Sequence, residues 1–315
     1  MTDAARRRIL LVAHPKRKEA HDLAAGVVQR LHDAGMEVVV LRDEAAAVDL
    51  AGSPNVTLAD PAHPATGCEL VCVLGGDGTI LRGAEMSRGT GAPLLGVNLG
   101  HVGFLAESER EDLDETVERI VARDYAVEER MTLEVAVSHD GDPVYSSWAL
   151  NEASVEKASR ERMLELTVEI DGRPLSTRGC DGVVMATPTG STAYAFSAGG
   201  PVVWPDVEAM LLVPISAHAL FARPMVVGPS SHLALEVVAD TQGSGVLWCD
   251  GRRAIDLPPG ARIEVVRSDT PVRLARLTSS PFTDRLVAKF DLSIHGWRGA
   301  ARREQSASTP ASLSP

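Results

Sequence analysis

Strand-like and helix-like patterns alternate along the first 125 residues, and this alternation constrains the fold more than any other feature. Short apolar runs predict buried strands, and longer stretches that mix polar and apolar residues predict helices. The expected elements, in chain order, are RRILLVAHP, a helix over about 16–34, MEVVVLR, LVCVL, the helical ILRGAEMSRG, PLLGVNLG and the helical EDLDETVERIVAR. The alternation predicts an α/β domain with a mainly parallel sheet over residues 1–125.

The pattern changes after about residue 125, where short strand-like runs replace the helices. Segments such as MLELTVEIDGRPL and GVLWCDGRRAIDL contain Asp-Gly pairs, which favour hairpin turns. Residues 126–281 are therefore expected to form a β-rich, antiparallel domain. The stretch 298–315, RGAARREQSASTPASLSP, has little apolar content and is expected to be a disordered tail.

Composition narrows the classes of partner. The chain has 315 residues, 44% of them hydrophobic, which suits well-buried cores in two domains. Its formal net charge of −12 argues against nucleic acid and anionic membranes as main partners. No apolar run approaches the roughly 20 residues of a membrane span, and the N-terminus does not read as a signal peptide, so we expect a cytoplasmic protein.

The four cysteines do not have the paired spacing of a zinc site. Cys68 and Cys72 lie in or beside an apolar strand-like run, and the other two are Cys180 and Cys249. Free buried thiols are therefore expected rather than a disulfide or a metal site.

The apolar run LVCVL ends abruptly at a glycine loop, GGDGT, which precedes a helical pattern. Ligands bind beyond the carboxyl ends of parallel strands, so this loop is expected at the active edge of the sheet. Gly75, Gly76 and Gly78 permit positive φ and let backbone N–H groups approach an anion, while the helix N-terminus adds partial positive charge. The combination is typical of a phosphate site.

Asp77 needs its own explanation, because a carboxylate beside a phosphate repels it. A general base that takes the proton of an attacking hydroxyl is one explanation, with Arg82 on the first helical turn reaching a phosphate oxygen. The competing interpretation is a strand-to-helix turn in which Asp77 or Thr79 caps the helix. The loop alone leaves both open.

Other familiar motifs are missing from the sequence. There is no Gly-Lys dipeptide, which excludes a Walker A loop, and no G-x-G-x-x-G dinucleotide fingerprint. There is also no H-R-D kinase loop, G-x-S-x-G elbow or H-E-x-x-H pair. Phosphate chemistry in this chain would therefore use another scaffold.

Two further stretches carry groups that can hydrogen-bond a polar ligand. In residues 180–203 a strand-like GVVMAT leads into a loop of hydroxyls with almost no bulk, suited to a sugar or heterocycle. The hydroxyls belong to Thr189, Ser191, Thr192 and Tyr194. The amide and carboxylate pair at 151–152 can read a base edge and a diol. Taken alone, the first stretch is explained more simply by an ordinary turn with local side-chain to backbone bonds, and a surface turn explains the second stretch equally well.

Taken together, these stretches resemble the NAD kinase family. The segments that carry the resemblance are GGDGT at 75–79, GVNLGHVGFLAE at 96–107, NE at 151–152, DGVVMATPTGSTAYAFSAGGP at 181–201 and HALFARP at 218–224. Their order and approximate spacing match the family over nearly the whole chain. The glycine loop alone is shared with diacylglycerol and sphingosine kinases and, loosely, with phosphofructokinases, so the other segments separate these families.

The resemblance implies transfer of the γ-phosphate of ATP to the 2′-hydroxyl of the adenosine ribose of NAD, which gives NADP. It implies Mg²⁺ on the triphosphate, with no metal ligands predicted among the side chains, and Asp77 as general base. The candidates for ATP phosphate binding are Gly75, Gly76, Gly78, Thr79 and Arg82. The candidates for NAD binding are Asn151, Glu152, Asp181, Ser191, Thr192, Ala193, Tyr194 and Ser197.

The resemblance also implies the overall organisation. The family has an α/β N-terminal domain and a β-rich C-terminal domain, in a fold shared with diacylglycerol kinases, and residues 282–297 would return to the first domain. A homodimer or homotetramer is implied, in which neighbouring subunits complete the active sites.

Several residues have competing interpretations. His101 and Phe104 could line the NAD pocket, although a turn histidine and a core phenylalanine explain them as well. Arg162 is a candidate whose alternative is a solvated surface charge. His218 is expected to be structural, and no role is assigned to Arg178.

Two other functions compete with an NAD kinase. A lipid kinase with the same glycine loop would need an apolar slot and membrane attraction, whereas this acidic chain has only 4% aromatic residues. A non-catalytic NAD(P) sensor would keep the fold without the chemistry, but pure binding gains little from a carboxylate facing phosphates. ATP or polyphosphate as donor, NADH as acceptor, feedback regulation and the number of subunits stay open.

Overall fold

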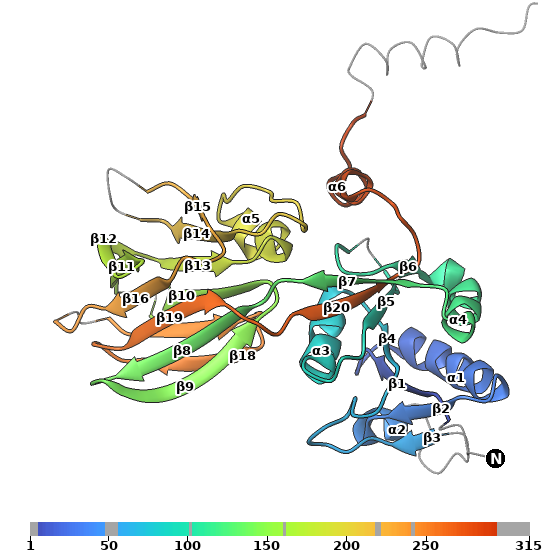
Figure 1. Cartoon of the computed structure of the whole chain (residues 1–315). Coiled ribbons are helices and arrows are strands. Elements are labelled where there is room, and N and C mark those ends of the chain that lie inside the picture. Colours follow the sequence, from blue (N-terminus) through green and yellow to red (C-terminus); the bar gives the residue numbers. More distant parts are fainter. Residues whose placement is uncertain are drawn as a thin grey trace, which may run out of the picture.

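The computed structural model describes residues 6–47, 56–100, 103–159, 162–217, 222–240 and 243–294. Two lobes make up this part of the chain, one with helices around a sheet and one built from two sheets (Figure 1). We call them the α/β lobe and the sandwich lobe. The fold class predicted from the sequence is confirmed. His101, His218 and the predicted tail at 298–315 lie outside the described residues.

The sheet of the α/β lobe has eight strands among the described residues, in the order β3-β2-β1-β4-β5-β20-β7, with β6 beside β5. Their bounds are β1 Arg8–Ala13, β2 Glu37–Val40, β3 Val56–Leu58, β4 Leu70–Leu74, β5 Leu94–Asn98, β6 Ser108–Glu109, β7 Ala126–Arg130 and β20 Val272–Arg276. All neighbouring pairs are parallel except β20 and β7. The expectation of a mainly parallel sheet therefore holds.

Helices cover both faces of this sheet. The helices of the lobe are α1 Lys18–Asp33, α2 Arg42–Ala47, α3 Asp77–Ser87 and α4 Leu113–Ala122, with a 3-10 turn η1 Arg110–Asp112 before α4. Apolar residues of α1 and α4 pack against one face, and those of α3 pack against the other. Strand β4 is buried along its whole length because alternate side chains enter the two cores, which explains its continuous apolar run.

The sandwich lobe consists of two six-stranded antiparallel sheets in the described residues, ordered β15-β14-β13-β10-β17-β18 and β12-β11-β16-β19-β8-β9. The strands are β8 Leu133–His139, β9 Asp142–Ala149, β10 Glu152–Lys157, β11 Leu164–Ile170, β12 Arg173–Cys180, β13 Gly182–Ala186, β14 Met210–Ile215, β15 Met225–Val227, β16 Leu233–Val237, β17 Gly245–Cys249, β18 Arg253–Leu257 and β19 Arg262–Arg267. One apolar cluster contains residues of both sheets, so the sheets pack face to face.

Three Asp-Gly pairs form hairpin turns of the kind expected from the sequence. Asp140 and Gly141 join β8 to β9 with φ of 53° and 85°, and the pairs at 171–172 and 250–251 also have positive φ at both residues. Two consecutive positive φ values match the right-handed twist of the flanking strands. All four cysteines are free and buried, as predicted.

Two strands that lie inside the predicted 126–281 domain belong to the other lobe. Strands β7 and β20 hydrogen-bond to each other in the sheet of the α/β lobe, so the chain leaves and re-enters that sheet through them. The return to the first lobe thus begins before residue 282, because β20 pairs with β5 in the sheet of the α/β lobe. The domain boundaries drawn from the sequence stay a prediction.

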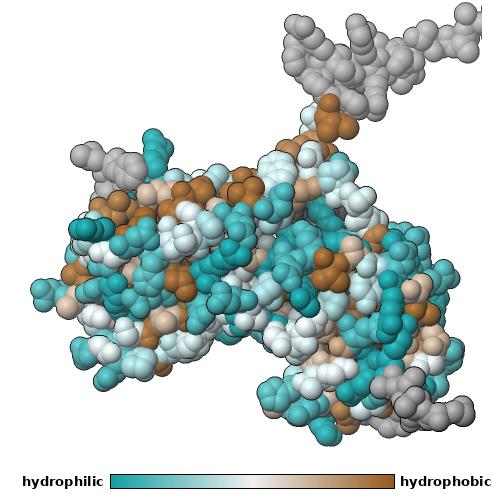
Figure 2. Space-filling view, viewed as in Figure 1, coloured by the Kyte–Doolittle hydropathy of each residue, from teal (hydrophilic) through white to brown (hydrophobic). Residues whose placement is uncertain are grey.

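The remaining helices lie on the upper side of the view in Figure 1. They are the 3-10 turn η2 Thr189–Thr192, α5 Tyr194–Ser197 and α6 Phe282–Phe290. In the space-filling view, apolar side chains gather along the upper edge of the sandwich lobe, the region of β14, β15 and α5 (Figure 2). Within the described ranges, none of the helices has the length and apolar character needed to cross a membrane.

Candidate active site

The glycine loop lies at the carboxyl edge of the parallel sheet, between β4 and α3. The sequence suggested positive φ at its glycines, but Gly75, Gly76 and Gly78 all lie outside the left-handed region. The reason is that α3 starts directly at Asp77, so an extended Gly76 leads straight into helical backbone. Gly75 is needed for another reason, since a Cβ there would lie 2.5 Å from Thr79 Oγ1.

The loop opens into a pocket of about 310 Å³ that is rich in positive groups. Arginines from three separate elements line it: Arg17 before α1, Arg82 on α3 and Arg252 in the β17–β18 turn. The pocket residues are His14, Pro15, Arg17, Gly76, Asp77, Gly78, Thr79, Arg82 and Arg252. Burial and the nearby Arg17 lower the pKa of His14. Cationic side chains beside the N-terminus of α3 make this pocket suited to phosphate groups.

Arg82 is already engaged in this structure. Its Nη1 lies 2.5 Å from Oε1 of Glu44, and its Nη2 lies 3.5 Å from Oδ2 of Asp43. The Glu44 side chain is only 3% exposed and also accepts the Ala13 N–H at 2.8 Å. Glu44 therefore holds Arg82 against the pocket wall.

Asp77 is bound to a segment more than 25 residues further along the chain. Its Oδ2 accepts the Phe104 N–H at 3.3 Å, and its Oδ1 accepts the Leu105 N–H at 3.2 Å. Neither Asp77 nor Thr79 caps α3, because the N-cap residue is Gly76 and no side chain makes a capping bond. A Cβ on Gly103 would lie 2.4 Å from Oδ1, so this glycine lets the segment approach the carboxylate.

The Phe104 side chain lies among aromatic rings rather than among polar groups. Its ring packs against Phe282 and Phe290 of α6, with ring centroids 5.9 and 5.7 Å apart. The backbone of Phe104, rather than its ring, is therefore what reaches Asp77.

A second polar constellation forms where β10 begins. Asp250 accepts the N–H groups of Leu150, Asn151 and Glu152 at 3.0, 2.7 and 3.3 Å, and Arg253 pairs with it at 2.8 Å. Burial raises the pKa of Glu152 to about 8, with the charge of Asp250 acting in the same direction. This bent backbone presents Asn151 and Glu152 side by side.

The loop at 187–194 packs directly against the residues at the start of β10. The Thr187 hydroxyl donates to the Leu150 carbonyl at 2.6 Å, and the Tyr194 N–H donates to Glu152 Oε2 at 3.3 Å. A Cβ on Gly190 would lie 2.0 Å from the Asn151 carbonyl oxygen, so only glycine fits there. Two segments that the sequence could only treat separately thus form one surface.

The other predicted NAD-binding residues take different positions around this surface. The buried Ser191 hydroxyl donates to the Val203 carbonyl at 3.1 Å and accepts its N–H at 2.9 Å, so it locks the loop internally. Thr192 donates to the Thr189 carbonyl, and Ala193 and Tyr194 are half-buried. Ser197 is exposed, and Asp181 pairs with Lys157 at 2.5 Å.

Arg162 and Arg178 lie elsewhere in the sandwich lobe. Arg162 is exposed just before β11, and Arg178 is buried on β12, where its guanidinium bonds the Ser176 hydroxyl. Among the described residues, no group of three or more His, Cys, Asp or Glu side chains could hold a metal ion.

Helix α3 joins the two regions. Glu85 on α3 pairs with Arg252 at 3.0 Å and with Arg253 at 3.3 Å. Trp148 contacts Arg88, the residue directly after α3, and Arg253, with each guanidinium 4.6 Å from the ring centroid. Leu150, which precedes Asn151, is buried in the same apolar cluster as α3. One helix therefore carries the glycine loop at its start and contacts the Asn151 region along its length.

Sequence reasoning missed several of these residues. Arg17 had a usable signal, since Lys16-Arg17-Lys18 follows β1, whose carboxyl end lies beside that of β4. Asp250 and Arg252 had no such signal in the sequence, because an Asp-Gly turn has the same sequence pattern whether or not another segment packs against it.

An arginine-lined pocket with a fixed carboxylate, joined by one helix to a polar surface on a second lobe, is the arrangement expected of a two-lobed kinase of small molecules. Residues 9–125 match the family model described as the ATP-NAD kinase N-terminal domain, and residues 150–277 match the ATP-NAD kinase C-terminal domain. The chain belongs to the NAD kinase family, as the sequence motifs predicted.

Individual relatives are similar over nearly their full length. NAD kinase 2 of Streptomyces avermitilis is 61% identical over 302 residues, covering 95% of this chain and 99% of the relative. NAD kinase of Thermobifida fusca is 58% identical over 311 residues, covering 96% and 95%.

Solved structures show the same fold. Yeast NADH kinase complexed with NADH has a TM-score of 0.83 at 25% identity, covering 92% of this chain and 89% of that one. An NAD kinase from Archaeoglobus fulgidus in complex with ATP has a TM-score of 0.66 at 25% identity, covering 91% and 98%.

Proposed function

We propose that this chain transfers the γ-phosphate of ATP to the 2′-hydroxyl of the adenosine ribose of NAD and thereby forms NADP. The observation that carries the assignment of the reacting site is the Asp77 carboxylate, held by two backbone N–H groups in a pocket lined by three arginines. Membership of the NAD kinase family supports the choice of substrates.

In this proposal Asp77 acts as the general base. A ribose hydroxyl is a poor nucleophile near neutral pH, so Asp77 accepts its proton as the oxygen bonds to the γ-phosphorus. The bond from that phosphorus to the β,γ-bridging oxygen breaks, ADP leaves, and the proton stays on Asp77 until it passes to water. Arg17, Arg82 and Arg252, with the N–H groups at the start of α3, would bind the phosphate oxygens.

The surface around Asn151 and Glu152 would hold the dinucleotide. With a pKa of about 8, Glu152 is largely protonated at neutral pH and offers both a donor and an acceptor to a ribose diol. The Asn151 amide and the backbone of 192–194 would supply further contacts, whereas Ser191 supports the loop from behind. Asp181 and Ser197 remain candidates for dinucleotide contacts.

The remaining expectations rest on the family resemblance. Magnesium would arrive with ATP as part of the substrate. The resemblance implies a cytoplasmic homodimer or homotetramer with shared sites, and light scattering on the purified protein tests the subunit number. Exposed Phe196, Trp204 and Val207, which are 40%, 45% and 48% exposed, support a subunit contact near α5.

The decisive experiment measures NADP formation by the wild type and by Asp77→Asn. Each protein is incubated with Mg²⁺ and ATP or polyphosphate, and with NAD or NADH. The product is NADP from NAD and NADPH from NADH, and both are quantified by redox cycling with an NADP-specific dehydrogenase. We expect NADP from the wild type and at least a roughly hundredfold lower kcat in the folded variant, because the base is lost. The four substrate combinations also identify the donor and the acceptor.

Asp142→Asn is the matched control, because it makes the same change at an exposed position on β9. It should keep the wild-type rate. An active Asp77→Asn variant would remove Asp77 from the role of base and leave the reaction standing. A wild type that binds NAD but forms no NADP with either donor would instead favour a sensor.

A further inference from the structure

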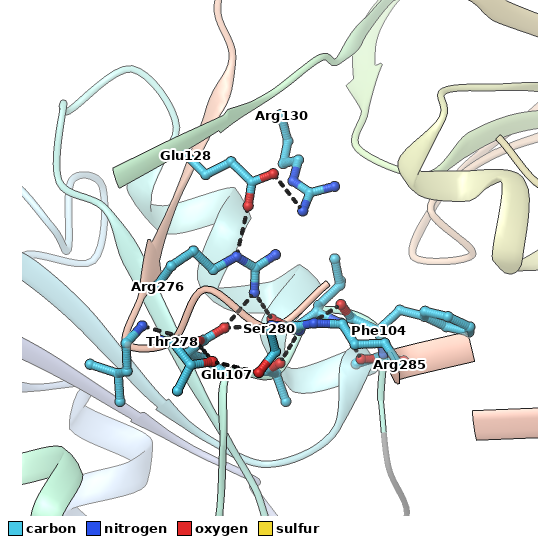
Figure 3. Close-up of polar contacts among 12 residues, drawn as sticks. Phe104, Glu107, Glu128, Arg130, Arg276, Thr278, Ser280 and Arg285 are labelled. Atoms are coloured by element: carbon cyan, nitrogen blue, oxygen red, sulfur yellow. Dashed lines mark hydrogen bonds and ion pairs between the residues drawn. The ribbon is translucent and has the colours of Figure 1, made fainter. Parts of the chain in front are cut away.

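The segment that holds Asp77 is itself held by the C-terminal helix. Arg285 of α6 reaches back to residues 104–107, about 180 positions earlier in the chain (Figure 3). Its Nη1 donates to the carbonyls of Phe104 and Ala106 at 3.3 and 2.6 Å, and its Nη2 donates to Glu107 at 2.6 Å. One guanidinium therefore binds this short segment at three points.

The carbonyl of Phe104 and the N–H of Leu105 belong to the same peptide group. Arg285 donates to the oxygen of this peptide group, and the N–H of the same peptide group, that of Leu105, donates to Asp77 Oδ1 at 3.2 Å. A peptide group is planar, so fixing its oxygen fixes the direction of its N–H. A cation on the oxygen also polarises the group and strengthens its N–H as a donor.

Glu107 anchors Arg285 in turn. Its carboxylate is completely buried and accepts hydrogen bonds from Arg276, from the N–H groups of Leu277 and Thr278, and from the Thr278 hydroxyl. Burial favours a raised pKa for Glu107, but the Thr278 hydrogen bond and the charges of Arg276 and Arg285 outweigh it and lower the pKa. The anchor is therefore charged near neutral pH, and it joins α6 to the end of β20.

Aromatic rings connect the same helix to the sandwich lobe. Phe290 lies against Phe196 of α5 with ring centroids 4.7 Å apart, and Phe282 lies against Trp204 at 5.3 Å. Phe104 packs between Phe282 and Phe290. No side chain of α6 is fully buried, so these rings and the Arg285 contacts are its main attachments in the described chain.

We propose that Arg285 is a positioning residue for phosphoryl transfer, which fixes the Phe104–Leu105 peptide group so that Asp77 keeps the orientation needed to accept the hydroxyl proton. The inference deepens the proposed function and rests on it. Helix α6 acts as a strut between the segment that holds Asp77 and α5, and Arg285 acts through the Phe104–Leu105 peptide group. A small rotation of Asp77 would lengthen the path of the proton, and misplacement by about 1 Å can cost up to about a hundredfold in rate.

The test is a double-mutant cycle between positions 285 and 77, measured as NADP formation. Arg285→Met should lower kcat about tenfold while the KM values for ATP and NAD stay within about twofold. Arg285→Lys, which can still donate to the carbonyls, should recover kcat to within about threefold of the wild type. In an Asp77→Asn background, Arg285→Met should change the residual rate less than about twofold, because no base is left to orient.

Lys289→Met is the matched control, because it removes one cation from an exposed position on the same helix. It should leave kcat unchanged, and thermal unfolding of each variant checks the fold. If Arg285→Met does not fold, the cycle is measured with Arg285→Lys instead. This variant should lower kcat up to about threefold when Asp77 is present and leave the residual rate unchanged in the Asp77→Asn background.

The positioning role is overturned if Arg285→Met lowers the rate equally with Asp77 present and in the Asp77→Asn background. It is also overturned if Arg285→Met changes only the KM values, or if Lys289→Met lowers kcat as much as Arg285→Met does. If Asp77→Asn has no measurable rate, the split between kcat and KM in the single variants decides. Failure of the proposed function looks different, because the wild type itself would then form no NADP.

Discussion

Asp77 and Glu152 are carboxyl groups with opposite surroundings, one in each lobe. Asp77 is half-buried in a pocket with three arginines and accepts two backbone N–H groups. Glu152 is buried, accepts one N–H group and lies near a second carboxylate, Asp250. The surroundings, rather than the residue type, therefore keep Glu152 largely protonated near neutral pH, where it can share hydrogen bonds with a ligand as donor and acceptor.

Both carboxyl groups are oriented by backbone from distant parts of the chain. The Asp77 partners lie 27 and 28 residues away, and the Glu152 partner lies 42 residues away. In each case a glycine allows the close approach: Gly103 beside Asp77, and Gly190 beside the Asn151 carbonyl. The two regions can therefore be disturbed separately by matching substitutions.

Among substitutions that leave Asp77 itself unchanged, the largest effects are expected from alanine at these two glycines. In Gly103→Ala the new Cβ displaces the Asp77 carboxylate, so kcat should fall about thirtyfold while the KM for ATP and the Tm change little. In Gly190→Ala the new Cβ meets a backbone carbonyl that cannot rotate away, so the KM for NAD should rise about thirtyfold and the Tm should fall.

Steady-state kinetics and thermal unfolding distinguish the two outcomes. Gly26→Ala is the control, because nothing lies within 4 Å of its added Cβ on α1. The division of labour between the lobes is wrong if both variants lose kcat alone or both lose affinity for NAD alone.

An intermediate effect is expected when Glu152 becomes glutamine. The amide keeps a donor and an acceptor but cannot reproduce the carboxyl geometry, so the KM for NAD should rise about tenfold with less than a threefold change in kcat. A titration of NAD binding by calorimetry checks the affinity directly. A large loss of kcat with unchanged NAD affinity would instead give Glu152 a part in the chemistry.

The same variant should also change how stability depends on pH. A carboxyl whose pKa rises from 4.5 to about 8 on folding contributes most stability below pH 4.5 and loses it as the pH rises to 8. Relative to Glu152→Gln, the wild type should therefore lose of the order of 3 kcal/mol between pH 5 and pH 8.5. Urea unfolding at the two pH values measures this, and parallel curves for the two proteins would contradict the buried, protonated carboxyl.

The smallest effect is expected at Arg17, which is an exposed side chain on the rim of the arginine-lined pocket at the glycine loop. Arg17→Ala should raise the KM for ATP about threefold at low salt and less at high salt, with the KM for NAD unchanged, because a solvated charge contributes little and is screened. Arg30→Ala, which also removes an exposed arginine near α1's far end, should leave both KM values unchanged.

Local patterns predicted much of the fold and part of the site. The parallel strands, the hairpins at Asp-Gly and the position of the glycine loop follow from short-range periodicity and turn chemistry, which depend on neighbouring residues. The placement of β20 beside β5 could not be predicted in this way, because a short apolar strand has the same sequence pattern in either lobe. The family motifs pointed to Asp77, Asn151 and Glu152. They included Gly103 within the 96–107 segment without giving it a role, and they did not include Asp250 or Arg285.

The sequence by itself determined which strand ends in the glycine loop, which residue of that loop carries a carboxylate and which family the motifs belong to. Only the tertiary structure decided what holds that chemistry in place. Asp250 meets Asn151 across 99 residues, and Arg285 meets Phe104 across 181. Such contacts depend on how strands from both halves of the chain are ordered in the sheets. A hydrogen bond between distant residues leaves no periodic pattern in either segment, so no local pattern could have revealed them.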